Sequence, residues 1–76
     1  MEDKLKEIFA SIFDLEESEI MDDLSPQTNE AWESITHLMI ITEIESVFDI
    51  AINEEIIPDL NSFKKIKDEL LSMNVK

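Results

Sequence analysis

The sequence predicts an all-α fold, a small bundle of helices joined by one long and one shorter irregular segment. Its 76 residues suffice for one domain with a simple core, so we expect a single domain over residues 1–76. Apolar residues recur at three- and four-residue spacing in three separate stretches, which is the period of an amphipathic helix. The chain has no cysteine, so no disulfide framework supports this core.

The first predicted helix covers residues 2–13. One face of it collects five apolar side chains at helical spacing, namely Leu5, Ile8, Phe9, Ile12 and Phe13. The chain contains no glycine, the residue that most often follows the end of a helix. The pattern therefore predicts the helix but leaves its end near Asp14 poorly defined.

Residues 15–33 are predicted to form a long loop that is attached to the core at intervals. Ser, Asp, Asn and Pro, which favour turns, separate its apolar residues. Loops of this length are uncommon in compact domains and are often functional, and this one has room for a short helical turn. The expected anchors are Leu15, Ile20, Met21, Leu24 and Trp32.

Residues 34–48 are predicted to form the central helix. Two neighbouring faces are apolar, one formed by Leu38, Ile41 and Phe48 and the other by Ile40, Ile44 and Val47. Such a wide apolar stripe is typical of a helix packed against several others. Clusters of β-branched residues make a strand conceivable, but the length of the segment and its 3.6-residue period favour a helix.

Two further helices are predicted in the C-terminal part. The first is one or two turns long, with Asn53 as its N-cap and Pro58 as its stop. The second begins after a cap at Asn61 or Ser62 and continues to Met73. The core is expected to include Phe9, Phe13, Ile41, Phe48, Phe63, Ile66 and Leu70.

The charge of the chain is strongly negative and unevenly distributed. The net charge is -13, and no lysine or arginine lies between Asp14 and Asp59. Such a field repels nucleic acid and anionic membranes and attracts basic proteins, although acidity can also serve solubility alone. The longest apolar run is too short to span a membrane, and the N-terminal residues are unlike a signal peptide. We therefore expect a cytoplasmic monomer that binds no nucleic acid and does not insert into membranes.

Few residues could support chemistry. Ser34 and His37 are three positions apart, but no glycine builds the turn that exposes a nucleophilic serine, and a domain this small has little room for a cleft. A calcium loop of the EF-hand type also needs glycine. We therefore expect no catalytic residue and no metal site. Two roles then fit Ser34. It either caps the following helix or carries an attached group, and the second role is consistent with the preference of a helix N-terminus for a phosphate.

The segments "ESITHLMIITEIESVFDIAI" and "NEEIIPDLNSFKKIKDEL" resemble the acyl carrier proteins and the related carrier proteins of polyketide and peptide assembly lines. The family signature is D-S-[LM] at the start of its second helix. Here Glu33 stands in place of the aspartate, and Ala31 stands where glycine is common. "WESITH" is similar to the W-D-S-L-x-H variant of carriers outside primary fatty-acid synthesis. The resemblance covers nearly the whole chain.

This resemblance implies an acyl-carrier-like antiparallel four-helix bundle with three main helices and one short helix. It implies a discrete (type II) carrier, not an enzyme, with 4′-phosphopantetheine from coenzyme A attached to Ser34. The carrier would hold acyl or related groups as thioesters in a specialised pathway, such as polyketide, peptide, lipid or polysaccharide modification. Its partners would be a phosphopantetheinyl transferase and acyl-activating, acyltransferase or synthase enzymes with basic docking surfaces. The partner-facing positions would be Glu33, Ile35, Met39, Thr42 and Glu45.

Several alternatives remain at this point. The chain could be a housekeeping carrier of fatty-acid synthesis, or a carrier-like interaction module that lacks the prosthetic group. It could also be an acidic helical regulator that binds a basic enzyme without using Ser34. Trp32 is expected to anchor the loop, but it could instead contact the phosphopantetheine arm or a partner. His37 is expected to be a partly exposed helix residue, but it could instead influence the phosphate of that arm. Ile35 and Met39 fit peripheral core and partner contact equally well.

Overall fold

The computed structural model describes residues 1–75 and is all-helical over that range. Its three α-helices are α1 (Glu2–Phe13), α2 (Ser34–Phe48) and α3 (Phe63–Ser72), and two 3₁₀ turns are η1 (Glu17–Glu19) and η2 (Ile57–Asp59). The described residues contain no β-strand. The predicted bounds of the first and central helices are therefore confirmed, and so is the short helical turn inside the loop.

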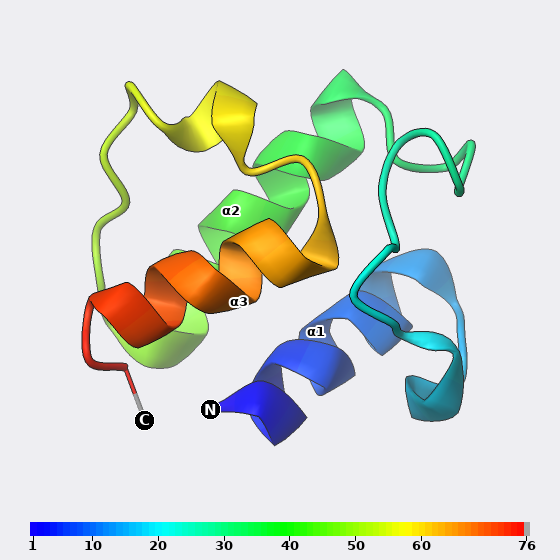
Figure 1. Ribbon diagram of the computed structural model, residues 1–76, viewed down its shortest axis with the longest axis horizontal. Coiled ribbons are helices and arrows are strands. Elements are labelled where there is room, and N and C mark those ends of the chain that lie inside the picture. The colour runs from blue at the N-terminus through cyan, green and yellow to red at the C-terminus, as the bar shows by residue number, and fades with distance from the viewer. Residues whose placement is uncertain (76) are drawn as a thin grey trace.

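The connection between α2 and α3 returns the chain to the end of the molecule where α2 begins. Figure 1 shows α1 and α2 running in opposite general directions, whereas α3 runs in the same general direction as α2. The expected antiparallel arrangement thus applies to α1 and α2. Because residues 49–62 travel back along the bundle, η2 and the start of α3 lie beside the start of α2. Three segments meet there.

The predicted short helix is a single turn, the shorter of the two expected lengths. Asn53 does begin a turn, since its side-chain Oδ1 accepts a hydrogen bond from the Glu55 N–H at 2.8 Å. The regular part that follows is only the three-residue η2. Pro58 lies inside η2 and does not end it, because the first turn of a helix does not use the N–H that proline lacks. The prediction of Pro58 as a stop was wrong.

An aromatic cluster joins the loop to the helices. The centroid of the Trp32 ring lies 5.6 Å from that of Phe9 and 5.7 Å from that of Phe13. Phe9 in turn packs edge-on against Phe63, with 5.1 Å between the ring centroids. Trp32 is only 4% exposed, which confirms it as a loop anchor. These four residues bring α1, α3 and the long loop into one core. The predicted core residues are buried, apart from Phe48, which is partly buried and packs against the hydrophobic core as a whole.

Three apolar residues expected to be anchors or core are on the surface, namely Met21, Leu38 and Val47. Met21 is exposed, so the loop is held by Ile20 and Leu24, together with Trp32. Leu38 is 58% exposed, because only one side of α2 is covered by α1 and the returning chain. The wide apolar stripe of α2 is therefore only half buried, and its remainder faces solvent.

Aspartate ends both long helices. Asp14 and Asp49 follow α1 and α2 in the left-handed conformation, with φ of 55° and 54°. Their N–H groups bond back to Ala10 and Glu45, which satisfies carbonyls at the helix ends. Aspartate tolerates this conformation better than most residues with a side chain. A chain without glycine thus still has defined helix ends.

The long loop is fixed by its own hydrogen bonds and by α3. Thr28 Oγ1 accepts a hydrogen bond from the Ser25 N–H at 2.9 Å and lies 3.2 Å from the Asp23 carbonyl oxygen. Near the start of α3, the Phe63 N–H donates to the Leu24 carbonyl at 2.9 Å. These contacts fix the part of the loop that leads to Trp32 and to the start of α2.

Candidate functional site

Ser34 is the first residue of α2, and its hydroxyl has no structural partner in the described chain. The N-cap is Glu33, whose backbone is extended and whose side chain makes no capping bond. Ser34 is exposed, and none of the hydrogen bonds within residues 1–75 uses its hydroxyl. Ser62 shows the contrast, because its side chain accepts the Lys65 N–H at 3.0 Å at the start of α3. Ser34 is therefore not a capping serine.

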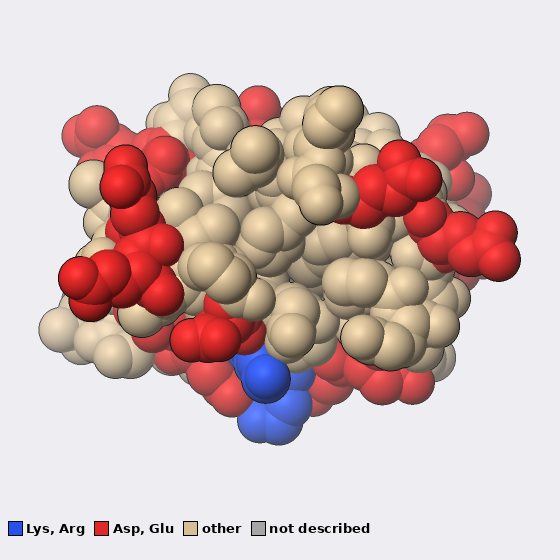
Figure 2. All heavy atoms as spheres, turned by 90° about the horizontal axis from the view of Figure 1, so that it is seen from above, with Lys and Arg blue, Asp and Glu red and all other residues tan. Residues whose placement is uncertain are grey.

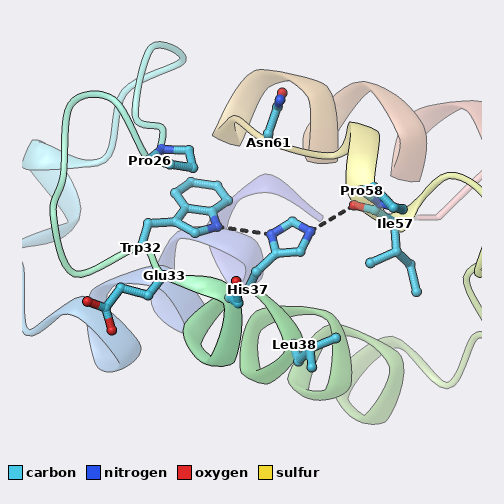
Figure 3. A pocket seen from close by; sticks show the side chains of 9 residues that line it. Pro26, Trp32, Glu33, His37, Leu38, Ile57, Pro58 and Asn61 are labelled. Atoms are coloured by element: carbon cyan, nitrogen blue, oxygen red, sulfur yellow. Dashed lines mark hydrogen bonds between the residues drawn. The ribbon is translucent and has the colours of Figure 1, made fainter.

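A pocket of about 550 Å³ lies beside Ser34, between the start of α2 and the returning chain. Figure 3 shows that its walls come from the loop, from α2 and from the segment around η2. Apart from Glu33 and the polar side chains of Ser34, His37 and Asn61, the walls are apolar. The full lining is Pro26, Trp32, Glu33, Ser34, His37, Leu38, Ile57, Pro58 and Asn61.

A hydrogen-bonded relay of three residues forms one side of this pocket (Figure 3). The Trp32 Nε1–H donates to His37 Nδ1 at 3.0 Å, and His37 Nε2 lies 2.7 Å from the Ile57 carbonyl oxygen. A carbonyl can only accept, so Nε2 carries the proton and Nδ1 is the acceptor. The relay links the loop, α2 and η2 through the neutral Nε2–H form of one imidazole.

An exposed apolar stripe runs along α2 from the residue after Ser34. Ile35 is 73% exposed and Met39 is 51% exposed, so both lie on the surface. Together with Leu38 they line a second hollow of about 400 Å³, to which α1 contributes Ile12. Thr42 and Glu43 complete its lining. The structure thus brings together three predicted partner-facing residues, Ile35, Met39 and Thr42.

The two predicted acidic docking positions differ in their surroundings. Glu33 is exposed at the rim of the pocket beside Ser34. Glu45 is half-buried, and its Oε2 accepts a hydrogen bond from the Ile52 N–H at 2.8 Å. Glu45 therefore holds the returning chain, whereas Glu43, which the sequence did not single out, is the exposed acid beside the apolar stripe.

Charges surround a mainly uncharged surface at this end of the molecule. Figure 2 looks down on the end that carries the start of α2 and η2, and shows acidic groups at both sides with lysines at one edge. On α3, Lys64 pairs with Asp68 and Lys67 pairs with Asp22. Among residues 1–75, no group of three or more His, Asp or Glu side chains is placed to hold a metal ion.

Sequence reasoning missed much of the pocket wall. Leu38 lies one turn after Ser34, and this spacing could have placed it beside the serine. Ile57, Pro58 and Asn61 come from a segment distant in sequence, and no local pattern indicates where that segment folds back. The partly exposed position predicted for His37 is confirmed, but its two hydrogen bonds depend on the same return of the chain.

No protein-family model matches the chain, and no curated protein shows significant similarity to it. None of the helices in the described range is long and apolar enough to cross a membrane. The function is therefore inferred from the geometry around Ser34, from the charge of the chain and from the resemblance of its sequence segments.

Proposed function

We propose that this chain is a discrete carrier protein that bears 4′-phosphopantetheine on Ser34 and presents acyl or related groups to partner enzymes. The observation that carries the proposal is the position of Ser34. Its hydroxyl is exposed, serves no capping role and lies at the edge of a mainly apolar pocket at the start of a long helix. Such a hydroxyl is accessible to an enzyme that attaches a group.

The residues around Ser34 fit a phosphate diester. The first main-chain hydrogen bond of α2 runs from His37 to Glu33, so the N–H groups of Ser34, Ile35 and Thr36 precede the intrahelical pattern. Free N–H groups at a helix start favour a negatively charged group bonded to the first residue. Glu33 opposes that charge, but it is exposed and therefore well screened by water.

The pocket fits the apolar part of the arm that would follow the phosphate. Leu38, Ile57 and Pro58 offer apolar surface within the same hollow as Ser34. When bound, the prosthetic group supplies a terminal thiol that forms thioesters. This chain has no cysteine of its own, so all thiol chemistry would come from that group.

The surroundings of Ser34 also suit presentation to other proteins. Ile35 and Met39 are exposed next to the attachment site, and Glu33 and Glu43 lie beside them. Interfaces commonly combine an apolar centre with a charged rim. A partner with an apolar patch and surrounding Arg or Lys residues would complement this surface, and the net charge of -13 would favour its approach.

Intact-protein mass spectrometry tests the proposal. Incubation with coenzyme A, Mg²⁺ and a broad-specificity phosphopantetheinyl transferase should increase the mass by one phosphopantetheine, and Ser34→Ala should prevent the gain. Ser46→Ala, which changes another exposed serine of α2, is the matched control and should be modified normally. Modification that persists in Ser34→Ala would exclude Ser34 as the attachment site.

A second candidate is an interaction module with the same fold and no prosthetic group. The exposed face of Ile35, Leu38 and Met39 favours it, because a partner could bind this face without any attached group. Under this alternative, no transferase would modify the chain, and Ser34→Ala would bind the partner as tightly as the wild type. The proposed carrier function predicts a mass gain instead.

A further inference from the structure

The relay of Trp32, His37 and Ile57 has a feature that the carrier function does not require. Both ring nitrogens of His37 are engaged, one by a donor from the long loop and one by an acceptor from η2. His37 is part-buried and is the only histidine, and Trp32 is the only tryptophan in the chain. Gain, loss or transfer of a proton on the His37 ring must therefore change at least one of these two hydrogen bonds.

Only one form of the imidazole satisfies both partners. In the neutral Nε2–H form, Nδ1 accepts from the indole and Nε2 donates to the Ile57 carbonyl. A second proton on Nδ1 would point at the Trp32 N–H across 3.0 Å, so two donors would face each other. The bond to Ile57 would remain, because Nε2 keeps its proton. Protonation therefore acts selectively on Trp32.

We propose that His37 is a proton-operated latch on the pocket beside Ser34. The neutral imidazole holds the Trp32 indole in the pocket wall, and the protonated imidazole releases it while α2 and η2 stay joined. Trp32 is at the end of the loop that leads into α2, and its ring packs against Phe9 and Phe13 of α1. A shift of the indole would therefore loosen the contact between this end of the loop and α1. The latch thereby couples the His37 proton to the shape of the pocket.

The charged groups on the loop and on the returning segment around His37 are all carboxylates, whereas the nearby start of α3 carries Lys64 and Lys65. Within three residues of Trp32 or Ile57 in the sequence, the loop contributes Glu30 and Glu33, and the returning segment contributes Glu54, Glu55 and Asp59. All five are exposed, and none of the ion pairs among residues 1–75 involves His37. No ion-pair partner therefore takes the place of the indole at Nδ1. The nearby carboxylates are negative and do not oppose protonation of the imidazole.

The consequence for the site depends on the proposed carrier function, whereas the latch itself does not. If Ser34 bears an arm, the released indole changes the wall against which that arm lies. Acidification would then alter how the arm is exposed to partner enzymes. The test below uses the unmodified protein, so its result is independent of whether Ser34 is ever modified.

Fluorescence of the single tryptophan reports the latch directly. The protein is titrated from about pH 8 to about pH 5, the interval in which histidine side chains exchange a proton. We expect the emission to shift to longer wavelength through a one-proton transition, as the indole gains access to water. Far-UV circular dichroism should stay constant over the same interval. A flat emission profile, or a simultaneous loss of helix signal, would overturn the latch.

Two variants separate the latch from other effects of acid. His37→Gln keeps an amide that can accept and donate but cannot titrate, so the transition should disappear. Ser34→Ala should retain the full transition, because it leaves the relay intact. If His37→Gln does not fold, ¹⁵N NMR of the wild-type imidazole decides the question. The neutral ring must be the Nε2–H tautomer, and the Trp32 indole N–H resonance must move with the same proton. An Nδ1–H tautomer would refute the proposal.

Discussion

His37 and Glu45 lie eight residues apart on α2 and hold the same returning segment of the chain. His37 Nε2 donates to the Ile57 carbonyl at 2.7 Å, and Glu45 Oε2 accepts the Ile52 N–H at 2.8 Å. These are the two side-chain hydrogen bonds that join α2 to residues 49–62 within the described chain. One bond lies at the Ser34 end of the helix and the other near its C-terminal end. The pair keeps η2 beside Ser34.

Loss of the Glu45 carboxylate should destabilise the protein. In Glu45→Ala, the N–H of buried Ile52 loses its acceptor, which costs about 1–3 kcal/mol of unfolding free energy. Glu45→Gln keeps a carbonyl oxygen and should be close to wild type. Glu43→Ala, an exposed acid on the same helix, is the matched control. Urea unfolding measures all three, and equal stability of the two alanine variants would contradict the structural role of Glu45.

Ser34 and Ser62 should respond differently to alanine. Ser34 makes no capping bond, so Ser34→Ala should change the unfolding free energy by at most about 0.5 kcal/mol. Ser62 caps α3 through Lys65, so Ser62→Ala should cost about 0.5–2 kcal/mol. Thermal and urea unfolding of both variants provide the comparison. A larger loss for Ser34→Ala would show that its hydroxyl has a structural role after all.

The helical periods predicted the fold better than they predicted the surface. Leu5 and Phe9 on α1 and Ile40 and Ile44 on α2 are buried as the spacing indicates. Leu38 has the same spacing but is exposed, because the period shows which residues share a face and not whether another element covers it. The pocket depends on where residues 49–62 return, which is a long-range property that local patterns do not contain.

Helix ends were the other feature that the sequence left undefined. Without glycine, Asp14 and Asp49 take the left-handed position, and their neighbours give no local sign of it. Ser62 was recognised as a possible cap because serine is a frequent N-cap. That Ser34 does not cap α2 became clear only from the position of Glu33 as the N-cap residue, and the attachment of a group to Ser34 stays a prediction.

Glycine at position 49 should stabilise the protein. Asp49 has φ of 54°, a conformation that costs residues with a side chain up to about 1–2 kcal/mol and costs glycine little. Its negative charge also lies at the unfavourable end of the α2 dipole. Asp49→Gly should therefore raise the unfolding free energy by about 1 kcal/mol and the melting temperature by about 4–8 °C.

The matched control for this change is Asp3→Gly. Asp3 lies in the first turn of α1, where the acid is favourable and glycine is a poor helix former. This variant should lose about 1 kcal/mol. Differential scanning calorimetry of both proteins distinguishes a local backbone effect from the general effect of removing one negative charge, which would stabilise both variants alike.

The pair of Asp22 and Lys67 should contribute to stability over a defined pH window. The hydrogen bond from Lys67 lowers the pKa of Asp22, and the same bond raises the pKa of Lys67. A lowered carboxyl pKa means that the contribution is lost as pH falls below about 4, and a raised ammonium pKa means that it is lost as pH rises above about 10. Between these limits it is constant.

Denaturant unfolding of the wild type and Lys67→Met as a function of pH tests this window. The difference in stability between them should be flat from about pH 5 to about pH 9 and should shrink at lower pH. Lys65→Met is the control, because Lys65 is an exposed lysine of the same helix and is in none of the ion pairs among residues 1–75. A difference that grows as the solution becomes acidic would show that the Asp22 pair is not its source.

Charged and apolar residues on the exposed face of α2 should affect different rates of partner binding. If the proposed carrier function is correct, Glu33→Lys and Glu43→Lys should slow association with the phosphopantetheinyl transferase and flatten its dependence on salt, since exposed charges mainly steer encounter. Their equilibrium effect should be about 0.2–1 kcal/mol each. Ile35→Ala and Met39→Ala should instead speed dissociation, each costing about 1–3 kcal/mol if the side chain is buried on binding.

Leu71→Ala, an exposed leucine on α3, should leave both rates unchanged. Stopped-flow binding across a salt series measures these rates. If both charge reversals leave the association rate and its salt slope unchanged, the partner docks on another face.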